Sequence, residues 1–128
     1  MYTSNLAHFA VVASTLIAGT LAKPGFRGCN LNPTLNVDDA RALSAQFAND
    51  FSTLEVKASH TWVYKHGSSS ICIYNGYLFD NTHVVKRDFS IAINTILANC
   101  GSKGGRFTVQ GDTGLQVDVF LHGANDSC

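Results

Sequence analysis

Histidine and carboxylate side chains are the groups of this chain that could carry out acid–base chemistry. A small hydrolase such as a ribonuclease needs a histidine paired with a carboxylate or with a second histidine. Glu55, which is the single glutamate, and Asp118 are carboxylates that can supply such a partner. The spacing of these residues in the sequence does not match any known catalytic motif. A hydrolase is therefore kept as an alternative function for this chain. The histidines that follow the N-terminal segment are His60, His66, His83 and His122.

Motifs for other kinds of catalysis are absent from the sequence. Gly67-Ser68 lacks the Gly-x-Ser-x-Gly frame of a nucleophilic serine. The glycine-rich segment 100–106 (CGSKGGR) follows a predicted helix and precedes a predicted strand, whereas a phosphate-binding P-loop runs from strand to helix. No Cys-x-x-Cys pair and no histidine pair has the spacing of zinc ligands. We therefore expect no cofactor and no metal ion.

The charges of the chain are balanced, with nine Lys and Arg against nine Asp and Glu. A nucleic-acid-binding domain and a cationic membrane-active peptide would both show a basic excess. We therefore expect no nucleic-acid partner and no stable insertion into a membrane. Binding residues commonly lie on loops that helices and strands hold in place. The exposed basic candidates are Lys65 and His66 in a predicted turn, and Lys103 and Arg106 in or beside a predicted glycine-rich loop.

The spacing of apolar residues predicts two amphipathic helices. Asn36 is a suitable N-cap for the first helix, and Asp88 is the candidate N-cap of the second, which stops at Gly101. The apolar face of the first helix comprises Ala40, Leu43, Phe47 and Phe51. The apolar face of the second comprises Phe89, Ala92, Ile93, Ile96, Leu97 and Cys100.

Strands are predicted between and after these helices. Residues 54–64 alternate between two faces, with a break near Ala58-Ser59, and residues 71–74 form a short apolar strand. Residues 105–110 and 114–122 are strands joined by a turn at 111–114, while residues 23–33 are an irregular lead-in. The order helix, two strands, helix, two strands predicts an α+β fold. In this two-layer α/β sandwich, two helices pack on a mostly antiparallel sheet.

The N-terminal segment predicts export from the cell. An apolar run extends from Phe9 to Ala22, and small residues precede Lys23 in the pattern that a signal peptidase cuts. The run is too short for a membrane span, and no later segment resembles one. We therefore expect a signal peptide at residues 1–22 and a single secreted domain at residues 23–128.

The number of cysteines also indicates a protein that is exported from the cell. An even number of cysteines in a short secreted chain is typical of a disulfide-bonded protein. Two disulfides have three possible connectivities, and the spacing of the cysteines does not choose among them. The four residues concerned are Cys29, Cys72, Cys100 and Cys128.

Two processing signals lie in the predicted secreted domain. Asn125-Asp126-Ser127 is an acceptor sequence for N-glycosylation at Asn125. Lys86-Arg87 is a dibasic pair of the kind that Golgi proteases cleave. This pair stands at the predicted start of the second helix, and a folded helix boundary is a poor protease substrate. We therefore favour an uncleaved pair.

The cysteine-bearing segments resemble the C-terminal half of the secreted fungal killer toxins of the killer-protein-four type. The matching segments are 69–79 (SSICIYNGYLF), 93–101 (INTILANCG) and 114–128 (GLQVDVFLHGANDSC). Segments 60–64 (HTWVY), 68–74 (SSSICIY) and 85–97 (VKRDFSIAINTIL) also resemble the small fungal effectors of the extracellular-protein-two type, which are necrosis-inducing secreted domains. The resemblance covers residues 60–128.

This resemblance implies an α/β sandwich, a secreted protein and an action on another cell, either a competing fungus or a plant host. It also implies the pairing Cys29–Cys100 and Cys72–Cys128. The chain departs from the killer toxins in having fewer cysteines. It also has a less basic loop (YKHGSSS) ahead of the strand cysteine. In the toxins that basic loop is associated with action on calcium channels, so its dilution here counts against channel blockade as the function of this chain. We expect a monomeric toxin or effector that binds a protein on the target cell. An inert cell-wall protein is a third possibility.

Overall fold

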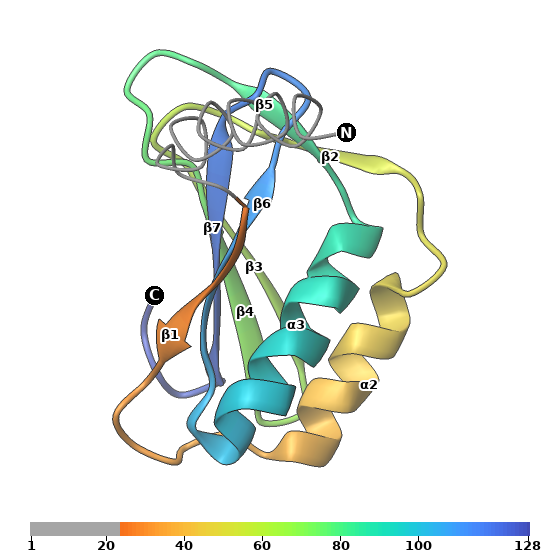
Figure 1. Cartoon of the computed structure of the whole chain (residues 1–128), viewed down its shortest axis with the longest axis vertical. Helices are drawn as coiled ribbons and strands as arrows, with labels where there is room; N and C mark the ends of the chain where they lie inside the picture. Colours follow the sequence, from red (N-terminus) through yellow and green to blue (C-terminus); the bar gives the residue numbers. More distant parts are fainter. Residues whose placement is uncertain (1–23) are drawn as a thin grey trace, which may run out of the picture.

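The computed structural model describes residues 24–128, and the predicted signal peptide at residues 1–22 lies outside this range. Two helices, α2 (Val37–Phe47) and α3 (Arg87–Cys100), lie side by side against one face of a five-stranded sheet (Figure 1). A two-stranded sheet made of β2 (Thr53–Val56) and β5 (Thr82–Val85) lies beyond the helices at one end of the molecule. The predicted α+β sandwich with two helices on an antiparallel sheet is confirmed.

The five-stranded sheet has the order β1-β6-β7-β4-β3, and every neighbouring pair is antiparallel. β7 is its central strand, with β6 and β4 on either side, and alternate residues of β7 and β4 belong to the buried core. The strands are β1 (Gly25–Cys29), β3 (Thr61–His66), β4 (Ser69–Tyr74), β6 (Gly105–Gln110) and β7 (Gln116–Gly123).

The core lies between this sheet and the two helices. Phe89 of α3 is fully buried and meets the ring of Phe47 of α2 edge-on, with ring centroids 5.4 Å apart. Full burial of one such side chain contributes about 1.5–3 kcal/mol relative to exposure. Other fully buried residues of the core are Leu43, Ile71, Ile73, Ile93, Ile96, Val119 and Leu121.

Helix α2 begins as predicted but ends earlier. Asn36 caps it, since its Oδ1 accepts a hydrogen bond from the backbone N–H of Asp39 at 3.0 Å. The helix ends at Phe47, so the assignment of Phe51 to its apolar face is wrong, and Phe51 is exposed. The carboxylate of Asp50 accepts the backbone N–H of Ser52, and this local turn leads the chain towards β2 instead of continuing the helix.

Helix α3 begins one residue before its predicted cap. Arg87 is its first residue, and Lys86 at the N-cap position makes no side-chain capping hydrogen bond. The backbone N–H of Lys86 instead donates to the carbonyl of Ser52 at 2.9 Å, as the chain leaves β5. Because strand β5 runs almost directly into the helix, Asp88 lies in the first helical turn and does not act as a cap.

The predicted strand 54–64 is two strands in different sheets. β2 pairs with β5, whereas β3 forms an edge of the larger sheet. The break near Ala58-Ser59 is confirmed, and Ser59 has a φ of 59°. A period of two residues marks any strand, so the alternation did not show that the two halves diverge.

The lead-in is more regular than its composition suggests. Residues 25–29 form β1, an edge strand that pairs with β6, so the prediction of an irregular segment is wrong. This pairing uses backbone groups, which a glycine-rich stretch supplies without any apolar alternation. β5 likewise lies in a segment for which no strand is predicted above.

Two disulfides close the fold, with the connectivity that the resemblance implied. Cys29 of β1 is bonded to Cys100 at the end of α3, and Cys72 of β4 is bonded to Cys128. Their Cα atoms are 5.4 Å and 5.9 Å apart, within the usual range for disulfides. Over residues 24–128, no helix combines the length and apolar character needed to cross a bilayer.

Candidate functional site

The four predicted basic residues lie at one end of the large sheet, in two separate pairs. Lys65 and His66 end β3, Lys103 belongs to the short 3-10 helix η1 (Gly101–Lys103), and Arg106 is the second residue of β6. β4 and β7 separate the pairs, which places them roughly 14 Å apart at the usual strand spacing. The prediction that Lys65 and His66 lie in a turn is wrong, because both belong to β3, whereas Arg106 lies in the strand predicted at residues 105–110.

Two of these residues have polar partners of their own. Arg106 Nη2 lies 2.9 Å from Asp118 Oδ1, and its guanidinium carbon lies 5.8 Å from the centre of the Phe120 ring. His66 Nδ1 lies 2.9 Å from Gln46 Nε2. Asp118 therefore neutralises an arginine, and the expectation that it could pair with a histidine is wrong.

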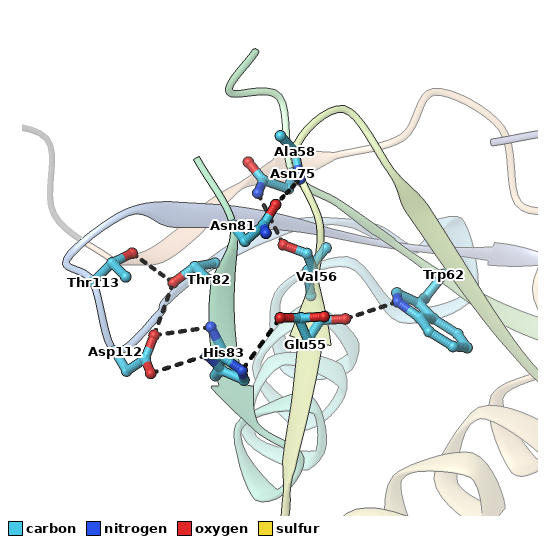
Figure 2. A network of polar contacts seen from close by, with 10 residues as sticks. All are labelled: Glu55, Val56, Ala58, Trp62, Asn75, Asn81, Thr82, His83, Asp112 and Thr113. Atoms are coloured by element: carbon cyan, nitrogen blue, oxygen red, sulfur yellow. Dashed lines mark hydrogen bonds and ion pairs between the residues drawn. The ribbon is translucent and has the colours of Figure 1, made fainter. Parts of the chain in front are cut away.

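The other expected carboxylate, Glu55, does meet a histidine (Figure 2). Glu55 of β2 lies directly opposite His83 of β5, with 3.6 Å between Glu55 Oε2 and His83 Nε2. On the other side of the imidazole ring, Nδ1 lies 3.1 Å from Asp112 Oδ2. We call these three residues the His83 network.

Asp112 belongs to the turn between β6 and β7, and it fastens that turn to β5. Its Oδ1 accepts the backbone N–H of His83 at 2.9 Å, and its own N–H donates to the carbonyl of His83 at 2.9 Å. The hydrogen bond from the His83 backbone is the main reason that the pKa of Asp112 lies below its ordinary value. Sequence reasoning missed Asp112, since a turn residue gives no signal of the strand on which the turn rests.

The chemistry open to the His83 network is limited by its exposure and its geometry. The side chains of His83, Glu55 and Asp112 are 43%, 44% and 58% exposed, so water reaches all three groups. The carboxylates approach opposite nitrogens of the ring, so they cannot join His83 at a single metal ion. The hydroxyl of Thr82, which precedes His83 in sequence, donates to Asp112 Oδ1 at 3.3 Å.

The remaining histidines have structural surroundings. His122 of β7 is buried, with Nδ1 2.7 Å from the carbonyl of Gly123 and Nε2 2.9 Å from Cys72 Sγ. The sulfur atoms beside it are joined in the Cys72–Cys128 disulfide, so they do not act as metal ligands. His60 lies in the exposed turn between β2 and β3, where Nδ1 is 2.8 Å from the carbonyl of Ala58.

The connection between β4 and β5 presents three consecutive apolar side chains to solvent. We call residues 75–81 the apolar loop. Leu78 is 73% exposed and Phe79 is 91% exposed, and Tyr77 beside them is also exposed. Isolated exposed apolar residues are common, but a contiguous group marks an interaction surface.

Hydrogen bonds hold both ends of the apolar loop. Asn75 is fully buried, and its Nδ2 donates to the carbonyls of Val56 at 3.0 Å and Asp80 at 2.8 Å. Asn81 Oδ1 accepts the backbone N–H of Ala58 at 2.9 Å. Figure 2 shows Asn75 pointing towards Val56 at the end of β2, and Asn81 pointing towards Ala58 in the chain that follows. The exposed tip is therefore carried on a fixed base.

A hollow lies where β2, β3 and the turn between them meet. Its cavity volume is about 380 Å³, and both Glu55 of β2 and Trp62 of β3 line it. We call it the tryptophan hollow. It is lined by Thr53, Leu54, Glu55, Lys57, His60, Thr61 and Trp62.

The two predicted processing signals differ in accessibility. Asn125 is exposed in a turn after β7. Lys86 is half-buried and its backbone is hydrogen-bonded, while Arg87 lies in the first turn of α3 with its guanidinium carbon 5.6 Å from the centre of the Phe51 ring. Cleavage between Lys86 and Arg87 would require local unfolding of the start of the helix.

Comparisons with known proteins do not assign the chain to a family: no protein-family model matches it, and no curated protein matches it significantly. The likeness to killer toxins and necrosis-inducing effectors therefore stays a prediction from short motifs. The surfaces described above are the basis for a functional proposal.

Proposed function

We propose that this chain is a small secreted, disulfide-bonded toxin or effector that acts on another cell by binding a protein on its surface. The observation that carries the proposal is the apolar loop, with Tyr77, Leu78 and Phe79 exposed together. Two disulfides in a domain of this size support an oxidising environment outside the cell. The motif resemblance supports a role against a competing fungus or a plant host.

The fixed base of the apolar loop favours binding energetically. A loop that is already ordered loses little conformational entropy on association, so more of the burial energy appears as affinity. Aromatic anchors in an apolar pocket commonly dominate the energy of a protein interface. Phe79, which is the most exposed of the three side chains, is the expected anchor.

The charge beside the tip favours a protein over a lipid surface as the binding partner. Asp80 directly follows Phe79, and it is the single charged residue of the apolar loop. Loops and helices that bind anionic membranes carry Lys and Arg beside their apolar residues. An anionic membrane surface would repel the carboxylate of Asp80, so a pocket in a protein is the better match for this loop.

The test is a double substitution with a matched control. Leu78→Ser with Phe79→Ser removes the tip, and Leu31→Ser with Phe51→Ser removes one exposed leucine and one exposed phenylalanine from elsewhere. Fluorescently labelled protein is applied to fungal cultures and to leaf tissue, and binding and cell damage are measured. We expect the loop variant to lose binding at least tenfold and the control to retain it, with equal denaturation midpoints.

Several outcomes would contradict the proposal. Undiminished binding by the loop variant would remove the apolar loop as the contact surface. If the protein bound protein-free vesicles of phosphatidylcholine and phosphatidylserine as strongly as it binds cells, the target would be a lipid surface and not a protein. Loss of activity on changing Lys65, His66, Lys103 and Arg106 together to Ala, with the loop variant active, would move the surface to the basic residues.

The His83 network supports a second, weaker candidate, a hydrolase of ribonuclease type. It is an exposed histidine beside two carboxylates, and a histidine paired with a carboxylate is a common acid–base catalyst. Cleavage of RNA by the purified protein, lost in His83→Ala and retained in His60→Ala, would favour this candidate. Equal and negligible cleavage by all three proteins would reject it.

A further inference from the structure

Trp62 presents a fixed aromatic surface at the tryptophan hollow. It is 46% exposed, although its Nε1–H donates to the carbonyl of Glu55 at 3.0 Å. In the sheet it lies opposite Ile73 of β4. Figure 2 shows the indole ring extending from β3 towards β2, with its nitrogen on the side of Glu55. A ring held in this way offers its face to a ligand at little entropic cost.

The other side chains of the hollow supply polar groups of both kinds. The carboxylate of Glu55 accepts hydrogen bonds, the ammonium group of Lys57 donates them, and the hydroxyl of Thr61 does both. Glu55 and Lys57 carry opposite charges, and the carboxylate of Glu55 also lies 3.6 Å from His83 Nε2. The hollow therefore suits a neutral ligand with many hydrogen-bonding groups better than an ion of either sign.

His60 adds a hydrogen-bonding group with a defined role. Its Nδ1 lies 2.8 Å from the carbonyl of Ala58, and a carbonyl oxygen can only accept. Nδ1 therefore carries the proton, and in the neutral ring Nε2 is an acceptor. Among the residues that line the hollow, Trp62 is the one aromatic ring besides this imidazole.

We infer that the tryptophan hollow binds a neutral saccharide, with one pyranose ring stacked on Trp62. The apolar face of a pyranose presents C–H hydrogens that carry slight positive charge, and these are attracted to the electron-rich face of the indole. Its hydroxyl groups both donate and accept, so they match Glu55, Lys57 and His60. The volume of about 380 Å³ lies in the range of small-molecule sites, roughly 300–1,000 Å³.

Other ligand classes fit the hollow less well. An anionic sugar or a phosphate would approach the carboxylate of Glu55. A quaternary ammonium group is held by several aromatic walls, and the hollow offers one indole. The inference goes beyond the proposed function, because the apolar loop is not among the residues that line the hollow.

Trp62 is the single tryptophan of the chain, so its signals report this site directly. The test records the indole N–H resonance and the fluorescence emission of the full secreted protein during titration. The probes are cellohexaose, laminarihexaose and the hexamer of N-acetylglucosamine as cell-wall saccharides, an oligomannose glycan as a glycoprotein saccharide, and choline as a cationic control. We expect at least one saccharide to shift both signals saturably, and the responding probe identifies its source.

Variants tie the response to the hollow. By calorimetry, Trp62→Ala should weaken saccharide binding at least tenfold, Trp62→Phe should weaken it less, and Phe51→Ala should leave it unchanged. Leu78→Ser with Phe79→Ser should also leave it unchanged, whatever that variant does to binding of cells. Absence of any saccharide response at millimolar concentrations, a response to choline alone, or unaltered binding by both Trp62 variants would overturn the inference.

Discussion

Glu55 of β2 and His83 of β5 are cross-strand neighbours whose side chains approach to 3.6 Å, and Asp112 holds the opposite side of the same imidazole ring. Through Asp112 the turn between β6 and β7 is attached to the small sheet. The three residues therefore join elements that are distant in sequence, besides presenting titratable groups to solvent.

Replacement of Asp112 by Asn should lower the free energy of unfolding near neutral pH. It should also make the free energy of unfolding less dependent on pH in the acid range. The pKa of Asp112 is lowered in the folded state, chiefly by the hydrogen bond from the His83 backbone. Its contribution is thus present above the unfolded pKa, about 4, and is lost as the pH falls through the lower folded value. Urea denaturation of both proteins at pH 6 and at pH 3 measures the difference. Asp38→Asn, which removes an exposed ion pair with Arg41, is the control and should change little.

Replacement of Cys128 by Ser should cost about 2–5 kcal/mol of unfolding free energy, as is typical for a disulfide of a small secreted domain. Cys72 is fully buried, so its freed thiol should react with a thiol reagent slowly in native protein and rapidly in denaturant. Denaturation curves and thiol titration measure both effects. An unchanged midpoint would show that this disulfide does not stabilise the fold.

Replacement of Gly67 by Ala should destabilise the hairpin between β3 and β4 by about 1–3 kcal/mol. Gly67 has a φ of 55°, and a Cβ atom there would collide with the carboxylate of Asp39, which accepts two hydrogen bonds from Ser68. Gly114→Ala separates the causes, because Gly114 also has positive φ but open space beside it. Equal losses in the two variants would mean that backbone strain, and not the contact with Asp39, decides the cost.

Replacement of Phe89 by Ala should cost about 3–5 kcal/mol, because it leaves a cavity where α2 and α3 meet. Phe89 is fully buried, and its ring contacts that of Phe47. Phe51→Ala, at an exposed phenylalanine, should cost less than about 0.5 kcal/mol. A small loss for Phe89→Ala would mean that the core closes around the missing ring.

The sequence was informative where the signal is local. Phe89, Ile93 and Ile96 recur along one helical face, and they are buried as predicted. Asn36 was identifiable as a cap because its partner, the N–H of Asp39, is three residues away. Such features depend on neighbours in the chain, so they can be predicted from spacing alone.

Contacts between distant segments were not predictable in the same way. β1 is a strand because β6, about eighty residues later, supplies its hydrogen-bonding partners. Asp112 meets His83 through a turn that rests on another sheet, 29 residues away in sequence. The surface at Leu78 and Phe79 likewise depends on the buried Asn75, whose partners belong partly to β2. The fold class was therefore predictable, whereas the composition of the candidate sites was not.

The two disulfides overlap along the chain, since Cys72 lies between Cys29 and Cys100, and Cys100 lies between Cys72 and Cys128. A single cut of any peptide bond between Cys29 and Cys128 therefore releases no fragment. A cut between Lys86 and Arg87 would leave two chains joined by both bridges. Such a nicked molecule would keep its size on a non-reducing gel and separate only after reduction, so a protease would have to cut the chain more than once to release a fragment.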